Sequence, residues 1–116
     1  MALHSVRTFR TAVSRLKAVT LVEQWESHVA KVGGKVFAMI SADGDHSTFK
    51  VSELSFDGLT SLEGIGQAPY FAKRAWVSVG KGAPLTDAEL RGYLKASHEM
   101  VAAKLTKKLR AELGLD

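Results

Sequence analysis

The sequence predicts an α+β fold with two layers, in which an antiparallel β-sheet carries helices on one face. Three observations lead to this class: an amphipathic helical pattern near the N-terminus, two β-prone runs joined by Gly33-Gly34, and a helix-capping motif before a long amphipathic segment. Hairpins favour antiparallel pairing, and amphipathic helices need an apolar sheet face to cover. The length of 116 residues fits one domain, so we expect a single domain over residues 1–116.

The first expected element is a helix over about Ser5 to Ala18. Its apolar residues recur at helical spacing and form one stripe: Val6, Phe9, Val13 and Leu16. A short, moderately β-prone strand over Thr20 to Trp25 is expected to follow. The helix and this strand therefore open the predicted two-layer arrangement.

A tight hairpin is the clearest local prediction. The runs His28 to Val32 and Lys35 to Ile40 flank Gly33-Gly34, and both turn residues of such a hairpin need a positive φ that glycine adopts without a Cβ clash. This turn pairs Val32 with Lys35 and Ala30 with Phe37.

A second turn and a further strand are expected after the hairpin. Asp43-Gly44-Asp45 is typical of a turn, and a third β-prone run follows over about Thr48 to Val51. The segment Ser52 to Ser61 then predicts a short helix with Leu54, Leu59 and Leu62 on its apolar side, and its end is left open by nearby glycines. Pro69 opens an extended stretch, and Ala75 to Val79 predicts another strand.

The C-terminal region predicts two helices. In Thr86-Asp87-Ala88-Glu89, the Thr hydroxyl and the Glu carboxylate can each accept from a backbone N–H that lacks a helical partner. The helix that begins there is expected to run to about Ala103. Leucines at positions 105, 109 and 113 predict a further short helix that Gly114 closes.

Composition excludes several classes of protein. The absence of cysteine excludes disulfide scaffolds, thiolate metal centres and a cysteine nucleophile, and the hydrophobic content of 46% argues against a disordered chain. Arginines interrupt the N-terminal segment, and the longest strongly apolar run is only Val36 to Ile40. We therefore expect a cytoplasmic protein that has no membrane segment, binds no cofactor and is a monomer.

No arrangement of residues predicts catalysis. No two of the four histidines have the spacing of a metal-binding helix, and Gly33-Gly34-Lys35 lacks the spacing and the following Ser or Thr of a phosphate loop. Asp43, Asp45 and His46 could hold a metal ion, although a solvated turn is the simpler interpretation. We therefore expect no enzyme, no catalytic residue and no metal site.

The net charge of +4 is unevenly distributed. Residues 1–19 contain four basic groups and no acid, whereas residues 20–72 contain three lysines and seven acids. Basic groups return at Lys73, Arg74 and Lys81, and again in residues 100–116. The Lys73-Arg74 pair beside Trp76 suits contact with phosphate and stacking on a base. The alternative is an ordinary solvated surface with Trp76 in the core.

Three stretches together resemble the MmcQ/YjbR family of small bacterial proteins with a CyaY-like fold. Residues 31–38 are similar to the family's K-V-G-G-K-hydrophobic-F-A hairpin, which a strand matching Thr48 to Val51 follows. Residues 68–77 are similar to its G/P-Y-x-x-K-R-x-W segment. Residues 96–108 are similar to its terminal S-y-x-L-V-x-A-K-L-P-K-K motif, with Thr106 where the family usually has proline. Threonine can replace that proline as a helix N-cap.

The resemblance implies an antiparallel sheet backed by helices, no established enzymatic activity, and DNA binding by paired hairpins that act as two wings. The residues that match the family's recurring positions are the hairpin tip Gly33 and Gly34 and the candidate nucleic-acid contacts Lys31, Lys35, Lys50, Lys73, Arg74 and Trp76. The second turn departs from this pattern, since Asp43 and Asp45 would repel phosphates.

Three functions therefore stay open. The first is a non-catalytic module that binds DNA through the Gly33-Gly34 hairpin and the Lys73-Arg74 segment. The second is a protein-interaction domain with an unknown protein partner, which would use the sheet face or the hairpin edge. The third is a small-molecule site or an enzyme formed by Tyr70, Arg74 and His98, and it requires these three side chains to meet.

Overall fold

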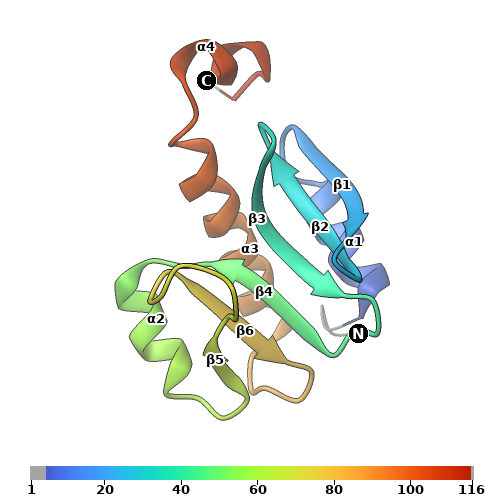
Figure 1. Ribbon diagram of the computed structural model, residues 1–116, viewed down its shortest axis with the longest axis vertical. Coiled ribbons are helices and arrows are strands. Elements are labelled where there is room, and N and C mark those ends of the chain that lie inside the picture. Colours follow the sequence, from blue (N-terminus) through green and yellow to red (C-terminus); the bar gives the residue numbers. More distant parts are fainter. Residues whose placement is uncertain (1–4, 116) are drawn as a thin grey trace.

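Six strands form one antiparallel sheet in the computed structural model, which describes residues 5–115 (Figure 1). The strand order is β1-β2-β3-β4-β6-β5. The elements in chain order are α1 Val6–Ser14, β1 Val19–Gln24, β2 Ser27–Val32, β3 Lys35–Ser41, β4 His46–Lys50, α2 Glu53–Thr60, β5 Ile65–Gln67, β6 Trp76–Gly80, α3 Asp87–Ala102 and α4 Lys107–Glu112.

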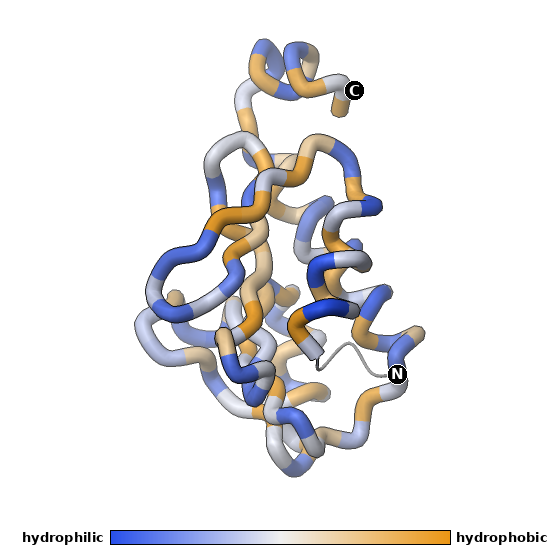
Figure 2. Tube along the Cα trace, turned by 90° about the vertical axis from the view of Figure 1, so that its right-hand side faces the viewer, coloured by the Kyte–Doolittle hydropathy of each residue, from blue (hydrophilic) through white to orange (hydrophobic). Residues whose placement is uncertain are grey.

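Helices cover one face of this sheet and leave the other open. Helix α1 contacts β1, β2 and β3, helix α3 contacts β2, β3 and β4, and helix α2 contacts β5 and β6. The tube in Figure 2 changes repeatedly between hydrophobic and hydrophilic colours along its length, as elements with one buried side require. The predicted α+β fold with a helix-backed antiparallel sheet is therefore confirmed.

The core lies between the sheet and the helices. Residues with almost no exposed surface come from all three covering helices and from strands β3, β4 and β6: Phe9, Val13, Phe37, Ile40, Phe49, Leu59, Val77, Val79, Leu90 and Leu94. Both the N-terminal stripe and the stripe behind the capping box contribute to it.

Among residues 5–115, none of the helices has the length and hydrophobicity that a membrane span needs.

Both predicted helix starts near the C-terminus are confirmed. The Thr86 hydroxyl accepts from the Glu89 N–H at 3.1 Å, and the Glu89 carboxylate accepts from the Thr86 N–H at 2.9 Å. At the start of α4, the Thr106 hydroxyl accepts from the Leu109 N–H at 3.1 Å. Thr106, which stands where the family that the chain resembles usually has proline, is therefore the N-cap of α4.

The hairpin register is partly as expected. Val32 pairs with Lys35, but Ala30 pairs with Ala38 and not with Phe37, because the register shifts between Ala30 and Lys31. Phe37 is the extra residue of a β-bulge, and its side chain is fully buried. The predicted pairing of Ala30 with Phe37 was wrong because a bulge depends on packing that a turn sequence does not show.

Three further predictions need correction. Helix α1 ends at Ser14, four residues before the predicted Ala18, and Ala18 itself has a φ of 59° where the chain turns into β1. Leu54 is 85% exposed, since α2 turns Phe56 and Leu59 toward the core. The glycine-rich segment after α2 forms the short edge strand β5, which pairs with β6 and had no strand pattern of its own.

Candidate nucleic-acid interface

The hairpin tip meets the connection between α3 and α4. A Cβ atom at Gly33 would lie 2.6 Å from Cδ1 of Leu105, so this tip packs closely against residues that are far away in the sequence. Gly33 and Gly34 have φ values of 58° and 79°, as the predicted two-residue turn requires. Residues 31–36 and 103–108 together contain five lysines and no acid, and this contact brings both segments to one end of the molecule.

Lys50 and Lys104 lie side by side at this basic end. The pKa of Lys50 is lowered, first by burial and then by the hydrogen bond and the positive charge of Lys104. Since the pKa is lower in the folded state, protonated Lys50 opposes folding at neutral pH, and this penalty disappears only as the pH rises above the usual lysine range. An anion bound between the two ammonium groups would offset the part of this penalty that comes from their mutual repulsion.

The backbone of Lys50 is held firmly. It is the last residue of β4, where it pairs with Trp76, and its carbonyl oxygen lies 2.5 Å from the fully buried Ser97 hydroxyl of α3. The same hydroxyl lies 2.8 Å from the Tyr93 carbonyl oxygen. Strand β4 and helix α3 therefore fix where the Lys50 side chain leaves the sheet.

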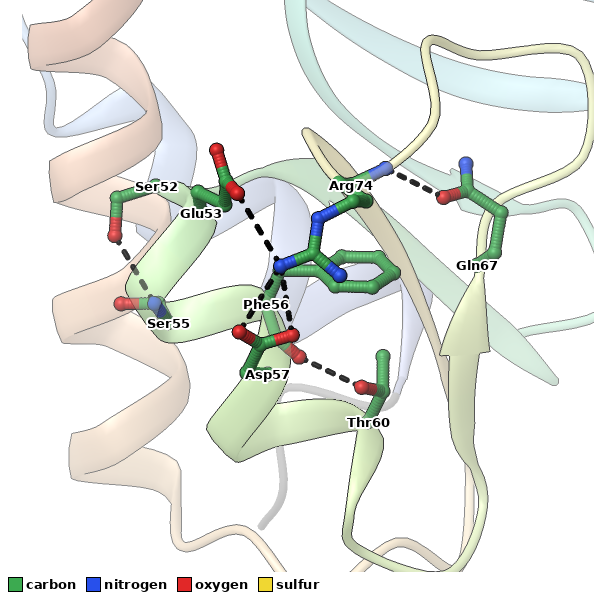
Figure 3. A network of polar contacts seen from close by, with 8 residues as sticks. All are labelled: Ser52, Glu53, Ser55, Phe56, Asp57, Thr60, Gln67 and Arg74. Atoms are coloured by element: carbon green, nitrogen blue, oxygen red, sulfur yellow. Dashed lines mark hydrogen bonds and ion pairs between the residues drawn. The ribbon is translucent and has the colours of Figure 1, made fainter.

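Arg74 is neutralised by two carboxylates of α2 (Figure 3). Its Nη2 atom lies 2.9 Å from Oδ1 of Asp57 and 3.3 Å from Oε1 of Glu53, and its guanidinium carbon lies 5.5 Å from the centre of the Phe56 ring. Asp57 is the main cause of the raised pKa of Arg74. This arginine therefore ties the 68–75 loop to α2 and is not a free cation for phosphate.

Trp76 and Lys73 differ in exposure. Trp76 is 8% exposed and stacks on Phe71, with 4.3 Å between ring centres and 29° between ring planes. Lys73 is exposed in the loop between β5 and β6. The structure thus places Lys31, Lys35 and Lys50 near the basic end, whereas Arg74 and Trp76 are occupied by contacts within the chain.

Gln67 fixes the same loop from β5 (Figure 3). Its side-chain N–H groups donate to the Ala68 carbonyl at 2.8 Å, and its Oε1 atom accepts from the Arg74 N–H at 2.9 Å. Longer contacts of 3.4 Å reach the carbonyls of Phe71 and Ala72. One side chain therefore holds both ends of the loop, a role that only its tertiary position reveals.

The third hypothesis, a pocket formed by Tyr70, Arg74 and His98, is wrong. His98 is buried on the helix side, where its Nε2 atom donates to the Lys17 carbonyl oxygen at 2.7 Å and its ring lies edge-on to Phe37. Tyr70 is fully exposed on the loop that lies over the other face of the sheet. The three side chains do not meet.

The Asp43-Gly44-Asp45 turn is organised by Asp43. Its Oδ1 atom accepts from the Ser41 hydroxyl at 2.7 Å and from the Asp45 N–H at 2.9 Å. The Ser41 hydrogen bond is the main cause of the lowered pKa of Asp43. Among residues 5–115, no group of three or more acidic, histidine or cysteine side chains is arranged to hold a metal ion.

A groove of about 910 Å³ lies on the open face of the sheet, and the sequence did not predict it. Its floor is a row of paired residues that crosses four strands: Met39, Thr48, Ser78 and Gly66. Trp25, Tyr70 and Phe71 also line it, and the high exposure of Trp25 and Tyr70 puts these two at its edges. In the sequence, the small residues of this floor are scattered over separate strands. They form one surface only through the pairing of those strands, which the sequence does not show.

Comparisons with known proteins agree with this fold. The family model described as YjbR matches residues 14–100. A crystal structure of a Deinococcus radiodurans protein with a DUF419 domain aligns with a TM-score of 0.86 and 24% identity, covering 97% of this chain and 89% of that one. A Pseudomonas syringae protein aligns with a TM-score of 0.68 and 18% identity, covering 83% and 97%. At these identities the two structures show a shared fold. No curated protein matches the chain.

Proposed function

This chain belongs to the YjbR family, and from that premise we propose that it is a non-catalytic module that binds nucleic acid through phosphate contacts at its basic end. We define the lysine cluster as Lys31, Lys35, Lys50 and Lys104. The observation that carries the proposal is the Lys50–Lys104 pair at the end where the Gly33-Gly34 hairpin meets Leu105; burial and then the neighbouring Lys104 lower the pKa of Lys50.

The contrast with Arg74 supports this choice. Arg74 has two carboxylate partners within 3.3 Å, so a phosphate would have to displace both. The lysine cluster instead combines segments that contain no acid with a like-charged pair that gains from an anion. We therefore propose Lys31, Lys35 and Lys50 as phosphate contacts and add Lys104 to them.

The hairpin acts in this proposal through its position and not as a free wing. Its tip is packed on Leu105, so Lys31 and Lys35 are presented together with the lysines that follow α3. Because this packing fixes the backbone that carries the lysines, binding to a phosphate backbone orders their side chains but does not have to order the chain itself.

We expect the double substitution Lys50→Gln and Lys104→Gln to weaken nucleic-acid binding roughly 10-fold at low salt. It should also reduce the magnitude of the slope of log affinity against log salt by about 1.4 to 1.8, because two fewer phosphates are neutralised and fewer counterions are released on binding. Fluorescence anisotropy of labelled single-stranded and duplex DNA over a salt series measures both quantities. The variant should be at least as stable as the parent, since it removes a repulsive pair.

The matched control is Lys81→Gln with Arg91→Gln, which removes the same charge from exposed positions near the start of α3. It should keep the parental slope. If neither form of DNA binds at low salt, or if the control weakens binding as much as the cluster variant, then the proposed function is wrong.

A further inference from the structure

The groove on the open sheet face has an uncharged lining. Its floor residues Thr48, Ser78 and Gly66 are small, and no Asp, Glu, Lys or Arg occurs among the described residues that line it. Its volume of about 910 Å³ is within the usual range for ligand sites. Such a lining suits flat, uncharged groups that stack and form hydrogen bonds, and it does not suit phosphate.

The two aromatic residues at the groove's edges have unfavourable backbone conformations. Trp25 and Tyr70 have φ values of 54° and 69°, and they are 63% and fully exposed. Glu26, the other central residue of the β1–β2 turn, has a φ of 56°, so this two-residue turn adopts its left-handed form without glycine. Bulky residues rarely keep such angles, and this strain gathers at ligand clamps.

The open face also has a charge gradient along its strands. Lys50 lies on it, two residues along β4 from Thr48 of the groove floor. Lys31 lies on it two residues along β2 from Val29, which pairs with Met39 of the floor. The opposite end carries acids, since the Glu26 turn and the Asp43 turn are joined by a 3.0 Å hydrogen bond from the Ala42 N–H to the Glu26 carbonyl.

We propose that this groove takes the bases of a single-stranded nucleic acid, whose phosphates lie on Lys31 and Lys50 at the basic end. This inference rests on the proposed function and names its substrate class. Bases would stack on Trp25 and Tyr70 and form hydrogen bonds with the hydroxyls of the floor. A duplex hides its base faces, and its second backbone would approach the acidic turns, where like charges repel.

Fluorescence of Trp25 tests the proposal. Trp76 is buried under Phe71, so a ligand in the groove should quench only Trp25. An oligothymidylate of about 12 nucleotides should quench the protein and bind more tightly than a duplex of the same length. Trp25→Asn should weaken this binding about 5- to 100-fold, because asparagine tolerates the left-handed backbone but cannot stack. Trp25→Phe should keep the affinity and lose the signal.

A second pair of variants tests the groove without touching the aromatic residues. A Cβ atom at Gly66 would meet nothing within 4 Å, and the backbone there is not left-handed, so Gly66→Leu should fill the groove and block the oligothymidylate. Gly92 is an exposed residue of α3 where an added Cβ atom would also meet nothing within 4 Å, so Gly92→Leu should bind normally.

The outcomes separate the two proposals. DNA binding that depends on Lys50 and Lys104 but is unchanged by Trp25→Asn and Gly66→Leu would overturn the groove proposal and leave the proposed function standing. Tighter binding of duplex than of oligothymidylate would overturn it too. Quenching of Trp25 by a proline-rich peptide, with none by oligothymidylate, would instead assign the groove to a polypeptide. No binding of any DNA at low salt would overturn both proposals.

Discussion

Replacing Phe37 by alanine is expected to lower the free energy of unfolding by about 3–5 kcal/mol, since it empties a fully buried aromatic site. Phe37 is the extra residue of the β3 bulge, and its ring lies 5.3 Å from the His98 ring at 88°. His98 in turn donates to the Lys17 carbonyl oxygen. The ring therefore joins the bulge to α3 and, through it, to the connection between α1 and β1.

Urea unfolding followed by circular dichroism measures this loss. The matched control is Leu54→Ala, which removes a large apolar side chain that is 85% exposed and should change the free energy of unfolding by at most about 0.5 kcal/mol. Similar losses for the two variants would contradict the burial of Phe37 and the exposure of Leu54. Equal loss would also restore the predicted apolar face of α2.

Replacing Trp76 by alanine is expected to cost about 3–5 kcal/mol as well. Trp76 is 8% exposed and supports Phe71 by stacking, so its loss removes both a buried ring and the inner support of the 68–75 loop. Trp76→Phe keeps an aromatic partner for Phe71 and should cost much less. Urea unfolding again gives the free energies.

A non-aromatic variant decides what Trp76 does, because leucine can fill the buried site but cannot stack on a base. The sequence left two interpretations open, a base-stacking ring or a core residue, and the structure places the ring beneath Phe71. We therefore expect Trp76→Leu to bind nucleic acid with parental affinity. A large loss of affinity in a variant that is still folded would show that Trp76 contacts the nucleic acid.

Features that depend on neighbouring residues were predictable from the sequence. The Gly33-Gly34 turn and the Thr86 capping box follow from backbone geometry within a few residues, and both are present. The amphipathic stripes led correctly to the helix-covered face of the sheet. These elements were enough to predict the fold class.

Features that depend on tertiary contacts were not predictable. The bulge at Phe37 exists because of packing against α3, and strand β5 exists because β6 offers it an edge. Arg74 was considered a phosphate contact, but its carboxylate partners are 17 and 21 residues away in the sequence. No pattern of neighbouring residues in the sequence predicts such an ion pair.

The candidate site shows the same division. Lys31 and Lys35 were predicted from the hairpin, whereas Lys104 joins them only because Leu105 packs on Gly33. The groove needs the pairing of four strands and two aromatic residues on left-handed backbone, and nothing local favours a positive φ at Trp25 or Tyr70.

The most direct test of the account is to map an oligothymidylate on the isotope-labelled protein by NMR at low salt. We expect the largest amide shifts around Lys31, Lys50 and Lys104, together with a shift of the Trp25 indole N–H. Signals from the first turns of α3 and from the Trp76 indole should stay in place. Shifts centred on the helix-covered face, or none at any DNA concentration, would contradict it.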